Sequence, residues 1–179
     1  YNTILGNRSL GSPKWSPNGE NIVFVASENY PPNYQSDIYV CNADGTNLMN
    51  VTSTDDYYES YPTWTPDGNN IVFVRRYNRW ELVTGNIYLS DLEGNIIRQI
   101  TNEEAVYSDL DVSPDGSSVA YFKLINNGNE FLNRININGN GERTLVTGLC
   151  GTYAGLEWSP DGQRIVYAAF TEGMGIGSI

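Results

Sequence analysis

One ten-residue pattern occurs four times and constrains the fold of this chain more than any other feature. The copies are WSPNGENIVF from Trp15, WTPDGNNIVF from Trp64, VSPDGSSVAY from Val112 and WSPDGQRIVY from Trp158. Their first residues lie 49, 48 and 46 positions apart. A regular period of this size is typical of architectures that stack one supersecondary unit. No low-complexity linker separates the copies, so we expect one domain over residues 1–179.

Each copy predicts a tight turn followed by a short strand. In Ser/Thr-Pro-Asp/Asn-Gly, proline presets φ at the second turn position, and glycine takes the positive φ that closes a hairpin. The runs that follow are apolar on both faces and rich in β-branched and aromatic residues, which predicts strands covered from both sides. These runs are IVFV at 22–25, IVFV at 71–74, VAYF at 119–122 and IVYA at 165–168.

The rest of the repeat predicts two more strands and a second turn. Third strands are expected at 37–42, 86–91 and 133–138, and fourth strands at 47–52, 95–101 and 143–148. The dipeptides between them, such as Asp44-Gly45 and Glu93-Gly94, suit hairpin turns. Four short antiparallel strands at this period describe one blade of a β-propeller. The predicted fold is therefore all-β, with four blades of which the last is incomplete.

The pattern Trp-Ser-Pro-Asp-Gly-x-x-Ile-x-Phe resembles the PD40 repeat, also called the WD40-like repeat, of TolB-like β-propellers. The four copies cover nearly the whole chain. Val112 stands where the pattern has Trp, and Asn18 where it has Asp, and both keep the turn chemistry. The resemblance implies a propeller that binds a partner without catalysis, in the periplasm or as a secreted protein. Related propellers occur in tricorn-type and prolyl-oligopeptidase-like proteins.

The phase of the repeats predicts blades at about 9–53, 57–101, 107–148 and 154–179. Residues 1–6 then align with the outer strand of a preceding or composite blade, carried by Asn2, Thr3, Ile4 and Leu5. Three interpretations stay open. The chain is a fragment of a propeller of about six to eight blades, or its first strand closes a small four-bladed ring. Alternatively, that strand is donated to the open blade of a neighbouring molecule, which can propagate into a filament.

Composition argues against several classes of function. The formal net charge is −11, with 10 basic and 21 acidic residues, so no basic face is expected for nucleic acid. No apolar run approaches the ~20 residues of a membrane-spanning helix, and we expect no membrane insertion. The chain has no histidine, which rules out a Ser-His-Asp triad. There is no Gly-x-Ser-x-Gly, no Cys-x-x-Cys and no calcium-loop spacing. We therefore expect no catalytic residues, metal or cofactor.

Candidate binding residues lie in the long connections between second and third strands. Those connections are expected at 27–36, 75–85 and 124–131, on the opposite end of the propeller from the uniform Pro-Asp-Gly turns. Varied loops on a rigid scaffold commonly carry function. The segment RRYNRW joins three arginines to two aromatic rings, the composition of interface hot spots. The candidate residues are Tyr30, Tyr34, Arg75, Arg76, Arg79 and Trp80.

Each candidate has a purely structural alternative. The arginines form a basic loop neutralised by acidic neighbours, and Tyr30 and Tyr34 belong to a stiff loop that folds over its own blade. Three functions follow from the sequence. The leading one is a non-catalytic scaffold that binds a protein, or another polymer such as a carbohydrate, through the loop-rich face. The others are a self-assembling extracellular structural protein and the propeller of a peptidase without its catalytic domain.

Overall fold

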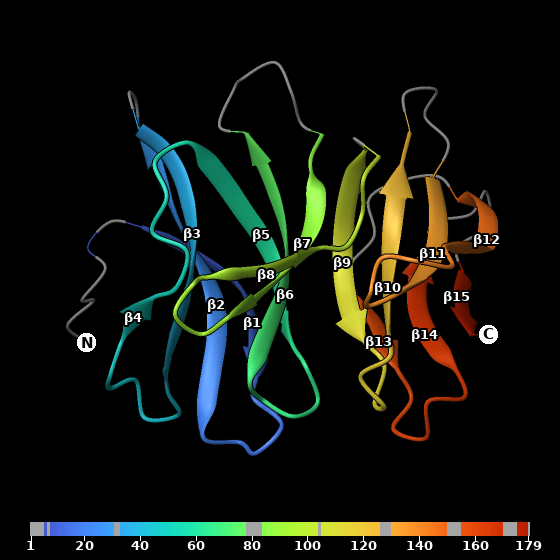
Figure 1. Cartoon of the computed structure of the whole chain (residues 1–179), viewed down its shortest axis with the longest axis horizontal. Helices are drawn as coiled ribbons and strands as arrows, with labels where there is room; N and C mark the ends of the chain where they lie inside the picture. The colour runs from blue at the N-terminus through green and yellow to red at the C-terminus, as the bar shows by residue number, and fades with distance from the viewer. Residues whose placement is uncertain are drawn as a thin grey trace.

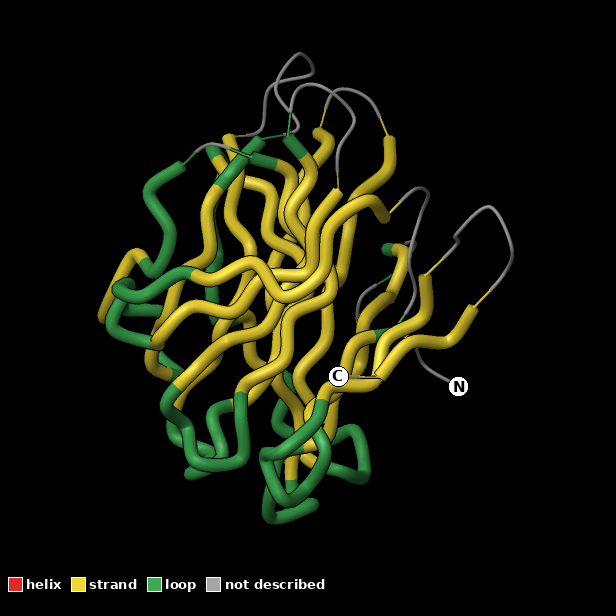
Figure 2. The backbone as a smooth tube through the Cα atoms, turned by 90° about the vertical axis from the view of Figure 1, so that its right-hand side faces the viewer, coloured by secondary structure: helices red, strands yellow, loops and turns green. Residues whose placement is uncertain are grey.

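The computed structural model describes residues 6, 8–30, 33–77, 84–103, 105–125, 130–149, 155–169 and 175–178. For residues 29, 30, 33, 34, 169 and 175–178 it describes the backbone only. The described residues form fifteen β-strands, which Figures 1 and 2 show side by side with turns between them. They include no helix that is long and apolar enough to cross a membrane.

The strands group into four blades in chain order. The first blade has the strands β1 (Ser9–Trp15), β2 (Asn21–Tyr30), β3 (Asn33–Asn42) and β4 (Met49–Asn50). The second has β5 (Tyr57–Trp64), β6 (Asn70–Tyr77), β7 (Asn86–Asp91) and β8 (Ile96–Gln99). The third has β9 (Val106–Val112), β10 (Ser118–Leu124), β11 (Glu130–Asn136) and β12 (Arg143–Leu149). The fourth has β13 (Leu156–Trp158), β14 (Ile165–Ala169) and β15 (Gly175–Ser178).

Within each blade, consecutive strands pair antiparallel. The first and second blades also share a parallel pair, Ser36 with Tyr58, and the second and third share an isolated antiparallel bridge, Gly85 with Ala105. The Pro-Asp-Gly turns lie at the lower end of Figure 1, and the ends of β2 and β6 lie at the upper end. This arrangement separates the uniform turns from the varied connections, as the repeat pattern predicts.

The core consists of three apolar layers, one between each pair of neighbouring blades. Because side chains of a strand alternate between its two faces, β6 contributes to two layers. Ile71 and Phe73 pack toward the first blade, whereas Val72 and Val74 pack toward the third, and all four are at most 3% exposed. The prediction that the apolar runs are covered from both sides is therefore confirmed for β6 and β10, whereas the runs in β2 and β14 are partly exposed.

The repeated turns have the expected geometry. Their glycines, Gly19, Gly68, Gly116 and Gly162, have φ between 67° and 73°. The hydroxyl of the Ser or Thr donates to the Asp carboxylate two residues later, at 2.5 Å in the second blade and 2.6 Å in the third and fourth. That carboxylate also accepts a backbone N–H from the residue two positions further on. Asn18 makes the same contacts in the first blade, which explains why Asn is accepted there.

Three segments differ from the prediction. The connection expected at 27–36 is mostly strand, since β2 and β3 pair continuously from Asn21–Asn42 to Tyr30–Asn33. Hydroxyl bonds from Ser27 to Ser36 and from Ser36 to the carbonyl of Glu59 support this long hairpin. The strand expected at 133–138 runs instead over 130–136, because Ile137 begins the turn. The outer strand expected at 47–52 is shortened to β4, with positive φ at Asn47 and Ser53.

Candidate functional site

The inner strand of each blade bends at the same position of the repeat, three residues before the Trp position. Ser12, Tyr61 and Asp109 have φ of 50°, 52° and 45° there, and Gly155 has 99°. The pairing of β1, β5 and β9 with their neighbours shifts register around these residues, which marks β-bulges. Positive φ in non-glycine residues is strained and clusters at functional sites. The bulges re-aim side chains toward the space between the inner strands.

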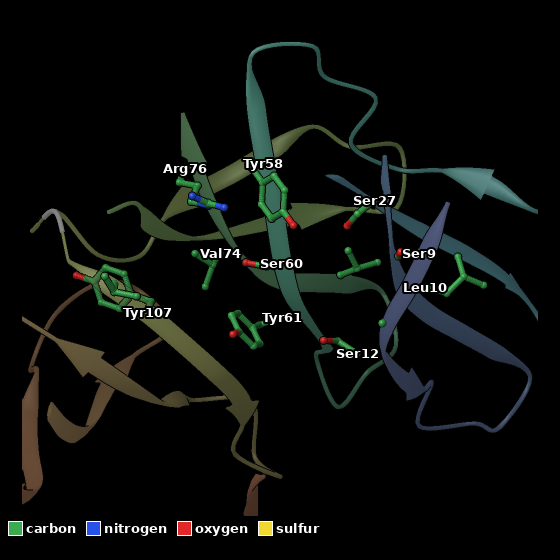
Figure 3. A pocket seen from close by; sticks show the side chains of 13 residues that line it. Ser9, Leu10, Ser12, Ser27, Tyr58, Ser60, Tyr61, Val74, Arg76 and Tyr107 are labelled. Carbon is green, nitrogen blue, oxygen red and sulfur yellow. The ribbon is translucent and has the colours of Figure 1, made fainter. Parts of the chain in front are cut away.

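A pocket of about 540 Å³ lies between β1, β5 and β9. Figure 3 shows its walls, with Arg76 and Tyr58 on one side, Tyr107 on another, and Ser12 and Tyr61 below. Hydroxyl groups and aromatic rings dominate the lining, and a single charged side chain contributes to it. The lining residues are Ser9, Leu10, Gly11, Ser12, Val25, Ser27, Tyr58, Ser60, Tyr61, Val74, Arg76, Val106 and Tyr107.

The two adjacent arginines of β6 have different environments. Arg75 is 11% exposed, and its Nε donates at 2.9 Å to the Oε1 atom of Glu59, whose side chain is 0% exposed. The Arg75 guanidinium also lies 4.8 Å from the ring centre of Tyr57 and 5.3 Å from that of Phe73. Arg75 therefore neutralises a buried acid within the second blade. The interpretation of a basic residue neutralised by an acidic neighbour holds for Arg75.

Glu59 is an unusual acid because it is fully enclosed. Burial raises its pKa to about 7, although the charge of Arg75 and a hydrogen bond from the Thr54 hydroxyl oppose this shift. The Thr52 hydroxyl also lies 3.4 Å from its Oε2 atom. The negative charge of Asp37 raises the pKa further. Glu59 therefore gains or loses its proton near neutral pH, while Arg75 stays charged.

Arg76 presents its charge to the pocket. Its guanidinium lies 4.2 Å from the ring centre of Tyr58, and no described residue forms an ion pair with it. Burial raises the pKa of the neighbouring Tyr61, the charges of Asp109 and Tyr58 add to the shift, and Arg76 opposes it. Arg76 is therefore a cation that lies against the Tyr58 ring at a concave surface. This geometry suits a ligand that carries a carboxylate.

A smaller pocket of about 200 Å³ shares Ser12 and Tyr61 with the first and also contains Asp109. Burial raises the pKa values of Asp109 and Asp111, and the charge of Lys14 opposes both shifts. Asp111 accepts the backbone N–H of Trp158 at 2.7 Å, which ties the fourth blade to the third. Within the described part of the chain, no group of three His, Cys, Asp or Glu residues is placed to hold a metal ion.

The predicted site residues meet different outcomes. Arg75 and Arg76 are expected in the connection at 75–85 but lie in β6, paired with Glu59 and Tyr58 of β5, and only Arg76 lines the pocket. Tyr30 and Tyr34 belong to the β2–β3 hairpin, and the structure describes their backbone but not their side chains. Arg79, Trp80 and the proposed donor strand Asn2, Thr3, Ile4 and Leu5 are outside the described residues.

The tyrosines and serines of the inner strands carry no sequence motif that marks them as site residues. Tyr58, Tyr61 and Tyr107 precede the repeated motif, where they resemble ordinary strand residues. A signal was present at the bulge position, because Ser12, Tyr61, Asp109 and Gly155 differ from one another while the flanking motif is nearly constant. A varied position beside a constant scaffold is where binding specificity resides.

Blades of antiparallel strands stacked face to face, with their inner strands bordering one pocket, define a β-propeller. The chain belongs to the TolB beta propeller domain family, PD40, whose profile matches residues 5–176. A search of curated protein sequences finds no match.

Solved structures similar to the chain include proteins of different function. TolB from Acinetobacter baumannii has a TM-score of 0.71 at 23% identity, over 90% of this chain and 38% of that one. An oligogalacturonate lyase in complex with manganese has a TM-score of 0.69 at 20% identity, over 95% of this chain and 47% of that one. A chain of the nidogen/laminin complex has a TM-score of 0.72 at 11% identity, over 90% of this chain and 57% of that one. These likenesses show the fold alone, and the chain spans less than half of the first and second proteins.

Proposed function

We propose that this propeller is a non-catalytic scaffold that binds a protein partner at the upper end of the inner strands. The observation that carries the proposal is the contrast between two neighbours. Arg75 is neutralised by Glu59, whereas Arg76 lies over Tyr58 at the pocket without an ion pair among the described residues. An acidic side chain of the partner supplies the missing carboxylate.

The surroundings of Arg76 support a recognition site. Arginine and tyrosine are enriched among residues that dominate binding energy at interfaces. A guanidinium can hold a carboxylate through two parallel hydrogen bonds, and the Tyr58 ring lies 4.2 Å from the Arg76 guanidinium. The nidogen/laminin neighbour is itself a protein complex by name. The proposal also includes Arg79, Trp80, Tyr30 and Tyr34, which the sequence analysis names as candidates and whose side chains lie outside the described part of the chain.

The composition of the pocket supports binding rather than catalysis. Its serines need an adjacent base to act as nucleophiles, and its lining contains neither a carboxylate nor a histidine. A carbohydrate rich in carboxylates is the alternative ligand, since a structural neighbour is named as an oligogalacturonate lyase. An extracytoplasmic location, periplasmic or secreted, fits the TolB family and is part of the proposal.

The test uses the 179-residue chain and two probes, a fluorescent glutamate-rich peptide and oligogalacturonate. Arg76→Gln should weaken peptide binding at least about tenfold, the typical loss of a charge-assisted pair. The matched control is Arg98→Gln, because Arg98 lies exposed on β8, where it donates a long hydrogen bond to the Asn138 carbonyl and forms no ion pair with a described residue. Equal binding by both variants contradicts the assignment of Arg76.

The second probe tests the proposed class of function. Tighter binding of oligogalacturonate than of the peptide would indicate a carbohydrate ligand in place of a protein partner. Cleavage of oligogalacturonate, with or without added manganese, contradicts the non-catalytic assignment. The peptidase hypothesis makes a separate prediction, namely that the same gene encodes an α/β-hydrolase domain.

A further inference from the structure

One position of the third strand is apolar in the first two blades and charged in the third. Val40 of β3 and Leu89 of β7 occupy it in the first and second blades, where they are 6% and 9% exposed and belong to the apolar layers between blades. In the third blade the residue is Arg134 of β11. The equivalence follows from the strand pairs Val23–Val40, Val72–Leu89 and Ala120–Arg134. The third blade therefore places a guanidinium where the layer between blades is otherwise apolar.

Arg134 reaches across to the tryptophan of the fourth blade. Its guanidinium carbon lies 6.0 Å from the ring centre of Trp158. Its Nη2 atom donates at 2.8 Å to the hydroxyl of Ser118, which is fully buried. The paired residue Ala120 is smaller than the valines at the same position of the first two blades. The contact between the third and fourth blades thus contains a positioned arginine beside an aromatic ring.

Trp158 is less well packed than the equivalent tryptophan of the second blade. Trp64 is 6% exposed, and its Nε1 donates to the carbonyl of Lys14 at 3.2 Å. Trp158 is partly exposed, and its Nε1 is enclosed without a hydrogen-bond partner among the described residues. The same holds for Nε of Arg134. Enclosed N–H groups without a partner cost free energy and are rare. Two of them side by side indicate that these residues do more than stack blades.

A pocket of about 360 Å³ lies beside this pair, between the turns of the third and fourth blades. Small-molecule sites usually have about 300 to 1,000 Å³, so the pocket suits one small ligand. It belongs to the end of the molecule that carries the Pro-Asp-Gly turns, whereas Arg76 lies toward the other end of β6 (Figure 1). The polar side chains and the ring that line it come from Asp115, Ser117, Arg134, Trp158, Asp161 and Gln163.

The charges of the lining favour a neutral ligand. Hydrogen bonds from the hydroxyls of Ser113 and Ser159 lower the pKa values of Asp115 and Asp161, so both carboxylates are ionised at neutral pH. An anion attracted by one guanidinium would therefore be repelled by two carboxylates. Oδ1 of Asp161 accepts the Ser159 hydroxyl and the backbone N–H of Gln163, whereas its Oδ2 accepts no hydrogen bond from a described residue. The pocket thus offers an acceptor and a cationic donor together.

A sugar has the groups that match this lining. Its hydroxyl groups both donate and accept hydrogen bonds, as a site with the Asp161 carboxylate and the Arg134 guanidinium requires. The C–H face of a pyranose ring is apolar and packs against an aromatic ring such as that of Trp158. The amide of Gln163, which is exposed at the rim, can donate and accept as well.

We propose that the pocket between the third and fourth blades binds a neutral sugar unit of a glycan. Arg134 and Asp161 bind its hydroxyl groups, and Trp158 packs against its ring. A shift of the Arg134 or Trp158 side chain brings the enclosed N–H groups into hydrogen bonds with the same ligand. The site is independent of the protein-partner site proposed at Arg76, because no lining residue is shared.

The test is saturation-transfer NMR, followed by titration calorimetry, of the 179-residue chain with the methyl glycosides of glucose, galactose, mannose and N-acetylglucosamine. At least one glycoside should bind with a dissociation constant in the millimolar range. Arg134→Leu should weaken that binding at least about tenfold, because it removes a cationic donor. Leucine is the residue of the second blade at this position, so the thermal midpoint should not fall. Arg76→Gln should leave sugar binding unchanged.

A second variant tests the acceptor within an intact turn. Asp161→Asn keeps the turn contacts, as Asn18 does in the first blade, but replaces the free Oδ2 by a donor. It should also weaken binding. Asp67→Asn is the matched control, because it makes the same change in the second blade, outside the pocket lining.

Four results would overturn the proposal. One is that no glycoside binds at up to about 20 mM, and another is that binding survives Arg134→Leu. A third is an equal loss in Asp67→Asn and Asp161→Asn. The fourth is tighter binding of inorganic phosphate or acetate than of every glycoside, which would identify an anion site.

Discussion

Gly94 of the second blade lies so close to Val51 of the first that a β-carbon on Gly94 would sit 2.0 Å from the Val51 carbonyl oxygen. Gly45, the equivalent turn residue of the first blade, has nothing within 4 Å of the same point. The two glycines share nearly the same φ, 85° and 84°. Both positions therefore share the strain of a positive φ, whereas only Gly94 makes a close contact with the neighbouring blade.

Alanine at these two glycines should have unequal effects on stability. Both substitutions place a β-carbon at positive φ, which costs about 1 to 2 kcal/mol. Gly94→Ala adds a clash with backbone, which cannot rotate away, and overpacking costs about 1 to 3 kcal/mol more. Urea unfolding should show the smaller loss for Gly45→Ala. Equal losses in the two variants would mean that the turn does not contribute to blade stacking.

The adjacent arginines of β6 should differ in the same assay. At pH 8, Arg75→Ala leaves the enclosed carboxylate of Glu59 without its cation, and breaking a buried pair costs about 3 to 5 kcal/mol. Arg76→Ala should change the free energy of unfolding by less than about 1 kcal/mol, because Arg76 has no ionic partner among described residues. At pH 5 the Arg75→Ala loss should shrink, since Glu59 can then be neutral. A larger loss of stability for Arg76→Ala than for Arg75→Ala at pH 8 would contradict the environments described for the two arginines.

Glu59 predicts a dependence of stability on pH near neutrality. Its pKa rises from an ordinary 4.5 to about 7 because burial favours the neutral acid. Between these values the folded state binds the proton more tightly than the unfolded state, so the free energy of unfolding falls as pH rises. The fall should be fully developed once pH exceeds about 7. Urea unfolding at pH 5, 6, 7 and 8 measures it.

Glu59→Gln is the control for this pH dependence. Glutamine keeps the shape and the hydrogen-bonding capacity of the side chain but does not titrate. Burial also raises the pKa values of Asp109 and Asp111 from their ordinary 3.8, so those acids contribute a slope of the same sign in both proteins. The slope between pH 5 and 7 should therefore become smaller in the variant. An unchanged slope would assign the pH dependence to other groups.

For Asp115 we expect the opposite dependence, in which stability falls as the pH becomes acidic. Hydrogen bonds from the Ser113 hydroxyl and the Ser117 backbone lower its pKa to about 2 from an ordinary 3.8. Its contribution to stability is present above pH 3.8 and is lost as pH falls through about 2. Asp115→Asn should retain most of the stability at neutral pH, as Asn18 shows in the first turn. Asp115→Ala should lower the thermal midpoint more, and equal midpoints would contradict a role for the accepted bonds.

The sequence predicted most strands and turns because their determinants are local. Proline and glycine define the Pro-Asp-Gly turns, and a run that is apolar on both faces identifies a strand between two layers. Segments without a local signal were less predictable. The hairpin around Tyr30 and Tyr34 contains Pro and Asn residues typical of loops, yet its pairing continues with the support of Ser27, Ser36 and the carbonyl of Glu59.

The candidate site was only partly predictable. The composition of RRYNRW drew attention to Arg75 and Arg76, but the side chains that accompany Arg76 come from other strands. Adjacent strand residues point to opposite faces, so the sequence implies that the two arginines differ. It does not say which one meets an acid. That depends on Glu59, which lies 16 residues away in the chain.

By itself, the sequence determined the repeating unit of this protein: a turn, an apolar second strand and an antiparallel blade, four times over. Those properties follow from backbone preferences and from a two-residue period of apolar side chains, both of which act within a few residues. Only the tertiary structure decided that Arg75 is neutralised and that Arg76 faces a pocket. The physical reason is that burial and charge pairing are set by neighbours from other blades, which no local pattern specifies.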